Sequence, residues 1–165
     1  VKSYFALSGL RRQCSCGWRV GNIIAPDYII KIIQQVNENV VFTAPSISQR
    51  AAIHALRYRN EVQPAMIEEY KKRVFYSAER IADIPKISVI DPPKGTFYLF
   101  INIRETGLTS VEASDMILRE AHVLTLPGDA FGNCGEGYIR IACTCSIDVL
   151  GEAFDRIERV MKARV

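Results

Sequence analysis

The sequence lacks long hydrophobic runs, blocks of like charge and the layout of a secretion signal. No apolar run reaches the roughly 20 residues that a membrane-spanning helix needs, and the first residues do not follow the plan of a signal peptide. The net charge is only +3 and no basic stretch stands out, which disfavours a nucleic-acid-binding or lipid-binding face. We therefore expect a soluble, cytoplasmic protein with neither nucleic acid nor membrane as a partner.

The sequence also lacks the ligand spacing of a metal site. Its five cysteines form two C-x-C pairs, at residues 14–16 and 143–145, with Cys134 alone. Zinc sites usually space their cysteines by two to four residues, so ordinary reduced thiols are favoured and no metal is expected. Cys143 and Cys145 are expected on the same side of a strand. His54 and His122 have no acidic or cysteine cluster nearby, and no serine–histidine motif supports a hydrolase.

The composition fits one ordinary globular core, since 48% of the 165 residues are apolar and 24% are charged. Helical periodicity is predicted for residues 27–36, 46–56, 62–81, 110–117 and 147–161, with Ser46, Ser110 and Ser146 as N-caps. Strands are predicted for residues 18–25, 87–90, 96–103, 123–126 and 138–144. This alternation indicates an α/β architecture, and the change of pattern near Pro85 is the best candidate for a domain boundary.

Arg140 lies in the middle of an apolar strand. Side chains alternate between two faces of a strand: one face would hold Ile139, Ile141 and Cys143, and the other Tyr138, Arg140 and Ala142. A guanidinium among apolar neighbours needs an anionic partner. Either a ligand carboxylate, gripped through two parallel hydrogen bonds, or an internal acid or water would serve. The strand considered alone favours the internal partner or solvent.

Two other segments hold candidate functional groups. Lys2 could form a Schiff base with an aldehyde cofactor, and the arginines that follow it could bind a phosphate. Basic residues near a terminus are nevertheless usually just solvated. Further along, four glycines within residues 128–137 surround Phe131, which predicts a close-packing loop. That loop either shapes the mouth of a pocket or simply connects two strands.

Four short motifs occur in the order of a known family. Residues 17–21 read G-W-R-V-G, residues 94–100 read K-G-T-F-Y-L-F, residues 126–132 read L-P-G-D-A-F-G, and residues 137–141 read G-Y-I-R-I. Together they resemble the class I/II aminotransferases, which are fold-type I pyridoxal-phosphate enzymes. The resemblance is closest to the bacterial-type aspartate and aromatic aminotransferases.

The resemblance implies that the chain is the C-terminal part of the fold-type I pyridoxal-phosphate transferase fold. Residues 1–60 would be the end of the large cofactor-binding domain, residues 61–84 the long connecting helix, and residues 85–165 the small α+β domain. The rest of the large domain would be missing. Without it, Ile23, Ile24 and the apolar stripe over residues 29–36 would lack their usual cover.

The resemblance also assigns roles to individual residues. Lys2 would be the Schiff-base lysine, Arg19 the arginine that binds the cofactor phosphate, and Arg140 the arginine that binds the substrate α-carboxylate. Three features depart from the family pattern. Val1 stands where a serine often precedes the lysine, the segment after Lys2 is one residue too long, and Gly9-Leu10-Arg11 repeats the motif that contains Arg19. Arg19 is favoured because a strand follows it, and Arg11 is the runner-up.

The implied activity is pyridoxal 5'-phosphate-dependent transfer of an amino group from an amino acid, of aspartate or aromatic type, to a 2-oxo acid. The family implies a homodimer, and this chain alone is expected to be inactive. One alternative is another fold-type I enzyme, either a lyase or a cyclopropane-forming synthase. The other is an inactive remnant or an effector-sensing domain of the kind fused to transcription regulators.

Overall fold

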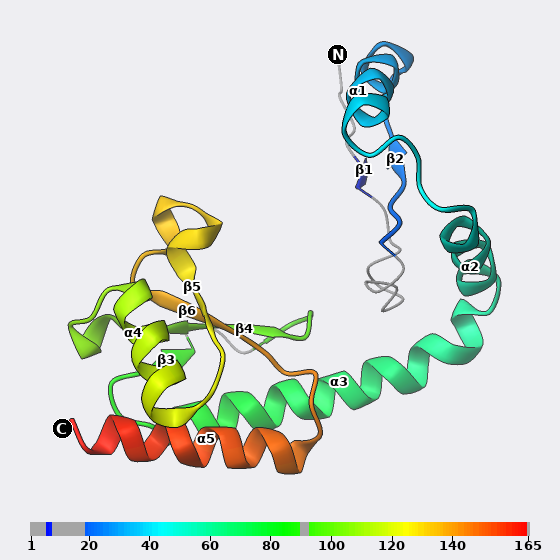
Figure 1. The fold of residues 1–165 in the computed structure, drawn as a ribbon. Helices are drawn as coiled ribbons and strands as arrows, with labels where there is room; N and C mark the ends of the chain where they lie inside the picture. The colour runs from blue at the N-terminus through cyan, green and yellow to red at the C-terminus, as the bar shows by residue number, and fades with distance from the viewer. Residues whose placement is uncertain (1–5, 8–18, 90–92, 165) are drawn as a thin grey trace. The chain divides into compact units, whose positions relative to one another are not determined.

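The structure is a computed structural model that describes residues 6–7, 19–89 and 93–164. The chain separates into two compact units, Val1–Ala65 and Met66–Val165 (Figure 1). Helix α3 (Arg59–Ala82) contributes its first residues to unit 1 and the remainder to unit 2. The assignment of residues 1–60, 61–84 and 85–165 to parts of a longer enzyme remains a prediction.

Unit 1 is built from two short strands and two helices. Strand β1 (Ala6–Leu7) pairs antiparallel with β2 (Ile23–Ile24), and helices α1 (Asp27–Val40) and α2 (Ser46–Arg57) follow. The expected strand over residues 18–25 is therefore only two residues long in the described part of the chain. The expected cap at Ser46 is wrong: Pro45 is the N-cap, and Ser46 is the first helical residue.

The apolar face of unit 1 is largely open to solvent. No residue of α1 is buried, and Ile24 and Val36 are 61% and 58% exposed. Ile29, Ile30 and Ile33 are only half-buried. The interpretation of residues 18–25 as a mostly buried strand is therefore wrong for Ile24, whereas the expected lack of cover over β2 and α1 is confirmed. Large contiguous apolar surfaces are rare on monomeric proteins, so this face is suited to burial.

Unit 2 contains a four-stranded antiparallel sheet in the order β3-β4-β6-β5. Its strands are β3 (Ser88–Val89), β4 (Tyr98–Asn102), β5 (Leu126–Pro127) and β6 (Tyr138–Ala142). Besides the larger part of α3, this unit contains the helices α4 (Ser110–Met116), which continues as a π-helical turn (Ile117–Ala121), and α5 (Ile147–Lys162). Short 3-10 turns occupy Arg104–Thr106, Gly128–Phe131 and Asn133–Gly135.

The helices of unit 2 share their core with one face of the sheet. Strand β6 buries Ile139 and Ile141 and leaves Tyr138, Arg140 and Ala142 half-buried or exposed, which confirms the predicted alternation within the strand. From α5 the core receives Leu150, Phe154, Ile157 and Met161. Burying a side chain such as Phe154 stabilises the fold by about 2–3 kcal/mol. The opposite face of β4 and β6, which holds Arg140, is only half-buried or exposed.

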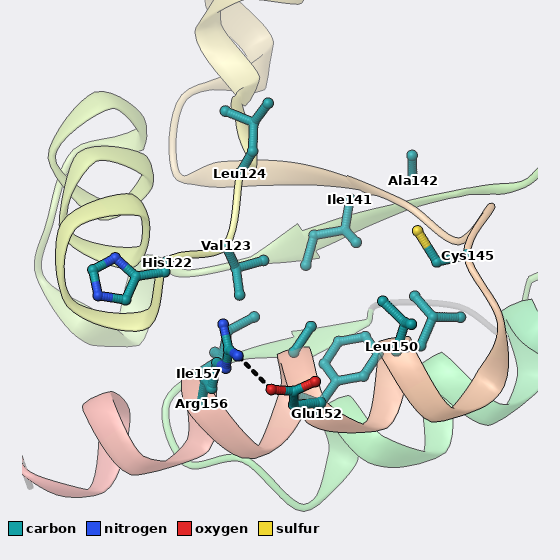
Figure 2. Close-up of a pocket in the computed structure, with 13 residues that line it drawn as sticks. His122, Val123, Leu124, Ile141, Ala142, Cys145, Leu150, Glu152, Arg156 and Ile157 are labelled. Carbon is teal, nitrogen blue, oxygen red and sulfur yellow. Dashed lines mark hydrogen bonds and ion pairs between the residues drawn. The ribbon is translucent and has the colours of Figure 1, made fainter.

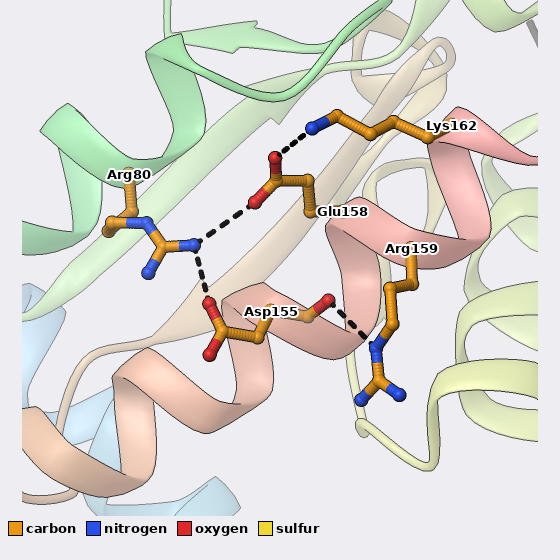
Figure 3. A network of polar contacts seen from close by, with 5 residues as sticks. All are labelled: Arg80, Asp155, Glu158, Arg159 and Lys162. Carbon is orange, nitrogen blue, oxygen red and sulfur yellow. Dashed lines mark hydrogen bonds and ion pairs between the residues drawn. The ribbon is translucent and has the colours of Figure 1, made fainter.

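A polar network joins α3 to α5 in unit 2 (Figure 3). The Arg80 guanidinium contacts the carboxylate of Asp155 at 2.8 Å and that of Glu158 at 3.2 Å. Lys162 contacts Glu158 at 2.6 Å, and its hydrogen bond is the largest cause of the lowered pKa of that carboxyl. Surface pairs contribute little to stability, so we interpret this network as setting the register of the two helices.

The N-cap of helix α4 lies one residue earlier than the sequence predicted. Thr109, and not Ser110, is the N-cap: its hydroxyl accepts a hydrogen bond from the backbone N–H of Glu112 at 3.2 Å. In return, the Glu112 carboxylate accepts from the Thr109 backbone N–H at 2.9 Å. This reciprocal pair is a capping box, and it releases the Ser110 hydroxyl for another role.

The ends of β6 and α5 differ from the sequence-based prediction in two details. Cys143 is buried while Cys145 is exposed, so the expectation that they share one side is wrong. The cause is that β6 ends at Ala142, and strand alternation no longer applies beyond it. Ser146 is the N-cap of α5 as expected, although its side chain makes no capping hydrogen bond within the described part of the chain.

Candidate functional site

The candidate site lies on the sheet face of unit 2 that the helices do not cover. Arg140 projects from the middle of β6 and is half-buried. It lies directly opposite Phe100 on β4 and Leu126 on β5. Because alternate residues share a face, Tyr98 and Tyr138 belong to the same surface. Arg140 is therefore surrounded mainly by aromatic and aliphatic side chains.

Two aromatic rings contact the Arg140 guanidinium. Its Cζ lies 4.3 Å from the ring centroid of Tyr98 and 4.2 Å from that of Phe131. Tyr98 comes from β4, and Phe131 comes from the turn that follows β5, on the other side of β6. Both distances lie within the range in which a guanidinium is attracted to a ring face.

No carboxylate pairs with Arg140 among the residues that the structure describes, in contrast to Arg80 and Arg119. The internal salt bridge that the strand pattern alone favoured is therefore not found there. A half-buried guanidinium retains a strong preference for an anion. Its free edge can donate two parallel hydrogen bonds, which matches the geometry of a carboxylate.

The surrounding rings form a connected cluster. Phe100 stacks on Tyr138 with their centroids 5.1 Å apart, and it meets Phe131 edge-on at 6.3 Å. At the end of this cluster, the Arg104 guanidinium lies 4.9 Å from the centroid of Tyr138. Aromatic pairs in these geometries attract one another beyond the effect of burial alone. The cluster therefore gives Phe131 a defined place beside Arg140.

The glycine turn, defined here as residues 128–137, packs too closely to admit side chains at two positions. A Cβ at Gly128 would collide with the carbonyl oxygen of Gly135 and would lie 2.7 Å from that of Tyr138. A Cβ at Gly135 would collide with the carbonyl oxygen of Gly128. The predicted close-packing loop is confirmed, and the mutual packing of the two glycines constrains the segment that holds Phe131.

Ser110 joins the glycine turn to helix α4. Its hydroxyl oxygen accepts hydrogen bonds from the backbone N–H of Gly137 at 2.9 Å and of Tyr138 at 3.3 Å. The Glu136 carboxylate accepts from the backbone N–H of Ser110 at 2.8 Å. These bonds set where β6 begins, and hence where Arg140 lies. Sequence reasoning missed this role because it assigned Ser110 to the helix cap.

Arg19 belongs to unit 1. Its side chain is exposed, and it makes no ion pair with any residue in the described ranges. Its backbone φ is 49°, in the left-handed region that non-glycine residues rarely adopt. Backbone conformations of this kind cluster at functional sites. A guanidinium without an internal ion pair can bind a phosphate through paired hydrogen bonds. Lys2 and Arg11, the other predicted cofactor residues, lie outside the described residues.

A separate groove of about 300 Å³ opens between β6 and α5 (Figure 2). Its lining is mainly apolar and includes Ile141, Leu150 and Ile157 but not Arg140. At its edge Glu152 and Arg156 form an ion pair with each other. Because its charged groups already satisfy one another, the groove lacks a free charge to orient a polar ligand.

Within the described residues, no group of three or more histidine, cysteine, aspartate or glutamate side chains could hold a metal ion. In the same ranges, every helix is too short or too polar to cross a membrane.

Comparison with known proteins identifies relatives along most of the chain. Residues 14–157 match the family model described as aminotransferase class I and II. A probable N-acetyl-LL-diaminopimelate aminotransferase of Bacillus subtilis is 39% identical, over 96% of this chain and 40% of the relative. An aspartate aminotransferase of Pyrococcus horikoshii is 38% identical, over 88% of this chain and 38% of the relative.

Solved structures agree with the sequence relatives. An aromatic aminotransferase from Pyrococcus horikoshii matches 90% of this chain and 40% of its own, with a TM-score of 0.79 and 37% identity. The chain therefore spans about 40% of the length of the proteins it matches.

Proposed function

We propose, on the premise that this chain belongs to the class I and II aminotransferases, that the protein containing it transfers an amino group from an amino acid to a 2-oxo acid. The fold class expected from the sequence, part of the fold-type I pyridoxal-phosphate fold, is confirmed by the structural match. Within this proposal, the donor is of aspartate or aromatic type. The observation that carries it is the Arg140 guanidinium, held between two rings without a carboxylate partner in the described residues.

Arg140 would bind the α-carboxylate that every amino-acid donor and 2-oxo acid acceptor shares. Two parallel hydrogen bonds fix both the position and the plane of a carboxylate. Fixing that group orients the α-carbon, so the bond to be broken faces the reacting centre. The two rings beside the half-buried guanidinium lower the local polarity, which strengthens its interaction with the anion.

The cofactor of the family is pyridoxal 5'-phosphate, whose conjugated pyridine ring accepts the electrons released at the substrate α-carbon. The exposed guanidinium of Arg19 has the chemistry to bind the phosphate group, and Arg11 is the runner-up. Lys2 would hold the cofactor through Nζ. When its Nζ is not bonded to the cofactor, this lysine would accept the proton from the α-carbon as a general base.

The proposal extends to the assembly of the whole enzyme. Residues 1–60 would complete a large domain, α3 would connect it to the small domain, and two copies would form a homodimer in the cytoplasm. The open apolar face of α1 supports this assignment, because a larger domain would bury it. The 165-residue chain alone would then be inactive.

The decisive experiment uses the full-length protein with added pyridoxal phosphate. We expect a visible absorbance band that Lys2→Ala abolishes. We also expect coupled formation of a keto acid and an aminated acceptor from 2-oxoglutarate with L-aspartate, L-phenylalanine or L-tyrosine. Elimination products without an aminated acceptor would instead indicate a lyase. A full-length protein that binds no cofactor would refute the proposal.

A further inference from the structure

We propose that Tyr98 and Phe131 are positioning residues that hold the Arg140 guanidinium in one plane, with its hydrogen-bonding edge presented to the substrate carboxylate. This inference rests on the proposed function, since it assigns a task to the surroundings of the proposed carboxylate-binding arginine. Both rings contact the same guanidinium carbon, at 4.3 Å for Tyr98 and 4.2 Å for Phe131.

The sheet topology explains how two rings reach one side chain. Arg140 pairs with Phe100 on β4, so Tyr98, two residues earlier on that strand, is its diagonal neighbour on the same face. Phe131 arrives from the turn after β5, the strand on the opposite side of β6. The guanidinium is thus bordered by aromatic surface from both neighbouring strands.

This arrangement reduces the cost of ordering the arginine. A free arginine side chain loses about 2 kcal/mol of rotamer entropy when it is immobilised. Contacts with the two rings impose much of that order before the substrate arrives, so less binding energy is lost on capture. In the described ranges no acidic side chain competes for the guanidinium. The rings therefore orient Arg140 without neutralising it.

Phe131 is itself held in place. Its ring meets Phe100 edge-on at 6.3 Å, and it lies in the glycine turn, where Gly128 and Gly135 pack against each other. A Cβ at Gly128 would also lie 3.0 Å from the Phe100 ring. The turn and the Phe100 ring together limit where the half-exposed Phe131 ring can lie beside Arg140.

The rings also restrict the direction from which an anion can approach. Aromatic surface over the guanidinium leaves its N–H edge as the accessible donor, and that edge matches a planar carboxylate through two parallel bonds. Removing a ring should therefore harm reactions that use the α-carboxylate and spare a substrate that lacks it. A general folding defect would harm both.

The test compares Tyr98→Leu and Phe131→Leu with Tyr98→Phe in the full-length enzyme. Tyr98→Phe keeps the ring and should stay within about twofold of the parent. Phe75→Leu is the matched control, because it removes an aromatic ring from α3 that is 41% exposed and lies outside the cluster around Arg140. Phe131 is 50% exposed, so its truncation should leave the fold intact.

The first substrate is whichever of L-phenylalanine and L-aspartate reacts faster with the parent enzyme. The second is the corresponding amine without the α-carboxylate, which is 2-phenylethylamine for phenylalanine and β-alanine for aspartate. For each leucine variant at the two positioning residues, we expect kcat/KM for the amino acid to fall about tenfold, with little change for the amine. The affinity for the carboxylate that lacks the amino group, 3-phenylpropionate or succinate to match the donor, should weaken by a similar factor when measured by calorimetry. Phe75→Leu should change the ratio between the two substrates by less than about twofold.

Three results would overturn the inference. These are equal losses for amino acid and amine, unchanged affinity for the matched carboxylate in both leucine variants, or the same loss in Phe75→Leu. Failure of the proposed function looks different. An enzyme without aminotransferase activity would still show, by calorimetry, whether the rings control binding of 3-phenylpropionate or succinate, and a parent protein that binds neither carboxylate would refute the role of the rings.

Discussion

The hydroxyl oxygen of Ser110 accepts a hydrogen bond from the backbone N–H of Gly137 over 2.9 Å, inside unit 2. Ser110 is the first residue of α4, and Gly137 directly precedes β6, so one buried bond joins a helix start to the strand that holds Arg140. Gly137 has a φ of 82°, and a Cβ there would lie 2.7 Å from the Arg104 side chain. The start of β6 is thus constrained from two sides.

We predict that Ser110→Ala destabilises the protein by about 1–3 kcal/mol, because it leaves the buried N–H of Gly137 without an acceptor. Ser114→Ala is the matched control: the Ser114 hydroxyl is buried without a hydrogen-bond partner among the described residues. Its removal should be neutral or slightly stabilising. Urea unfolding of the two variants measures the difference, and equal stability would contradict the role of Ser110.

Replacing Arg140 should remove most of the substrate recognition in the full-length enzyme. We predict that Arg140→Ala lowers kcat/KM for the amino acid about a hundredfold or more, since charged hydrogen bonds contribute about 1.5–3 kcal/mol each. Arg140→Lys should recover only part of this loss, because lysine cannot form the paired bonds. Arg119→Ala, which removes an exposed helix ion pair, is the control for lost positive charge. Unchanged kinetics in Arg140→Ala would remove it from the site.

Adding a side chain should be costly at Gly128, in the glycine turn, and harmless at Gly95, outside that turn. Gly128→Ala places a Cβ against the carbonyl oxygen of Gly135, and we expect a loss of about 1–3 kcal/mol or more. Gly95→Ala has nothing within 4 Å and no left-handed φ, so its stability should stay near that of the parent. Thermal unfolding distinguishes the two, and a tolerated Gly128→Ala would show that the turn can relax.

The capping box predicts an acid-sensitive contribution to stability. The backbone N–H of Thr109 is the largest cause of the lowered pKa of Glu112, and the Thr109 side chain adds to it. A carboxyl whose pKa is lower in the folded state stabilises the protein above its unfolded value, about 4.3. That contribution should disappear as the pH falls through the folded pKa. Melting temperatures of parent and Glu112→Gln should therefore converge toward pH 3, and a constant difference would contradict this.

Burial should separate the reactivities of the described cysteines. Burial raises the pKa of the Cys143 thiol, partly offset by a hydrogen bond with Ser77, whereas Cys134 and Cys145 are exposed. Because the thiolate is the reactive form, we predict that iodoacetamide at pH 8 modifies Cys134 and Cys145 first. Cys143 should react only after denaturant is added. Peptide mass spectrometry measures the order, and early modification of Cys143 would indicate that β6 opens readily.

Local sequence signals predicted the elements better than their ends. The apolar stripe of α5 and the alternation along β6 each follow from a residue period, so both could be predicted. The N-cap of α4 was also readable: Thr109 stands three residues before Glu112, whereas Ala113 occupies that position relative to Ser110. In the described residues, β2 pairs with β1 through Ile23 and Ile24, so the strand seen there is shorter than predicted.

The two-residue alternation of the strand was enough to predict that Arg140 lies on the face opposite Ile139 and Ile141. The order of the four motifs was enough to suggest the family. Both signals depend on residue types at fixed spacings. The sequence pattern could not show what Arg140 meets on that face. Tyr98 and Phe131 come from segments on either side of β6, and Ser110 holds the strand's start from a helix 27 residues before Gly137. Contacts between such distant segments depend on strand order and on packing in three dimensions, so only the folded chain decides that this arginine lies between two rings.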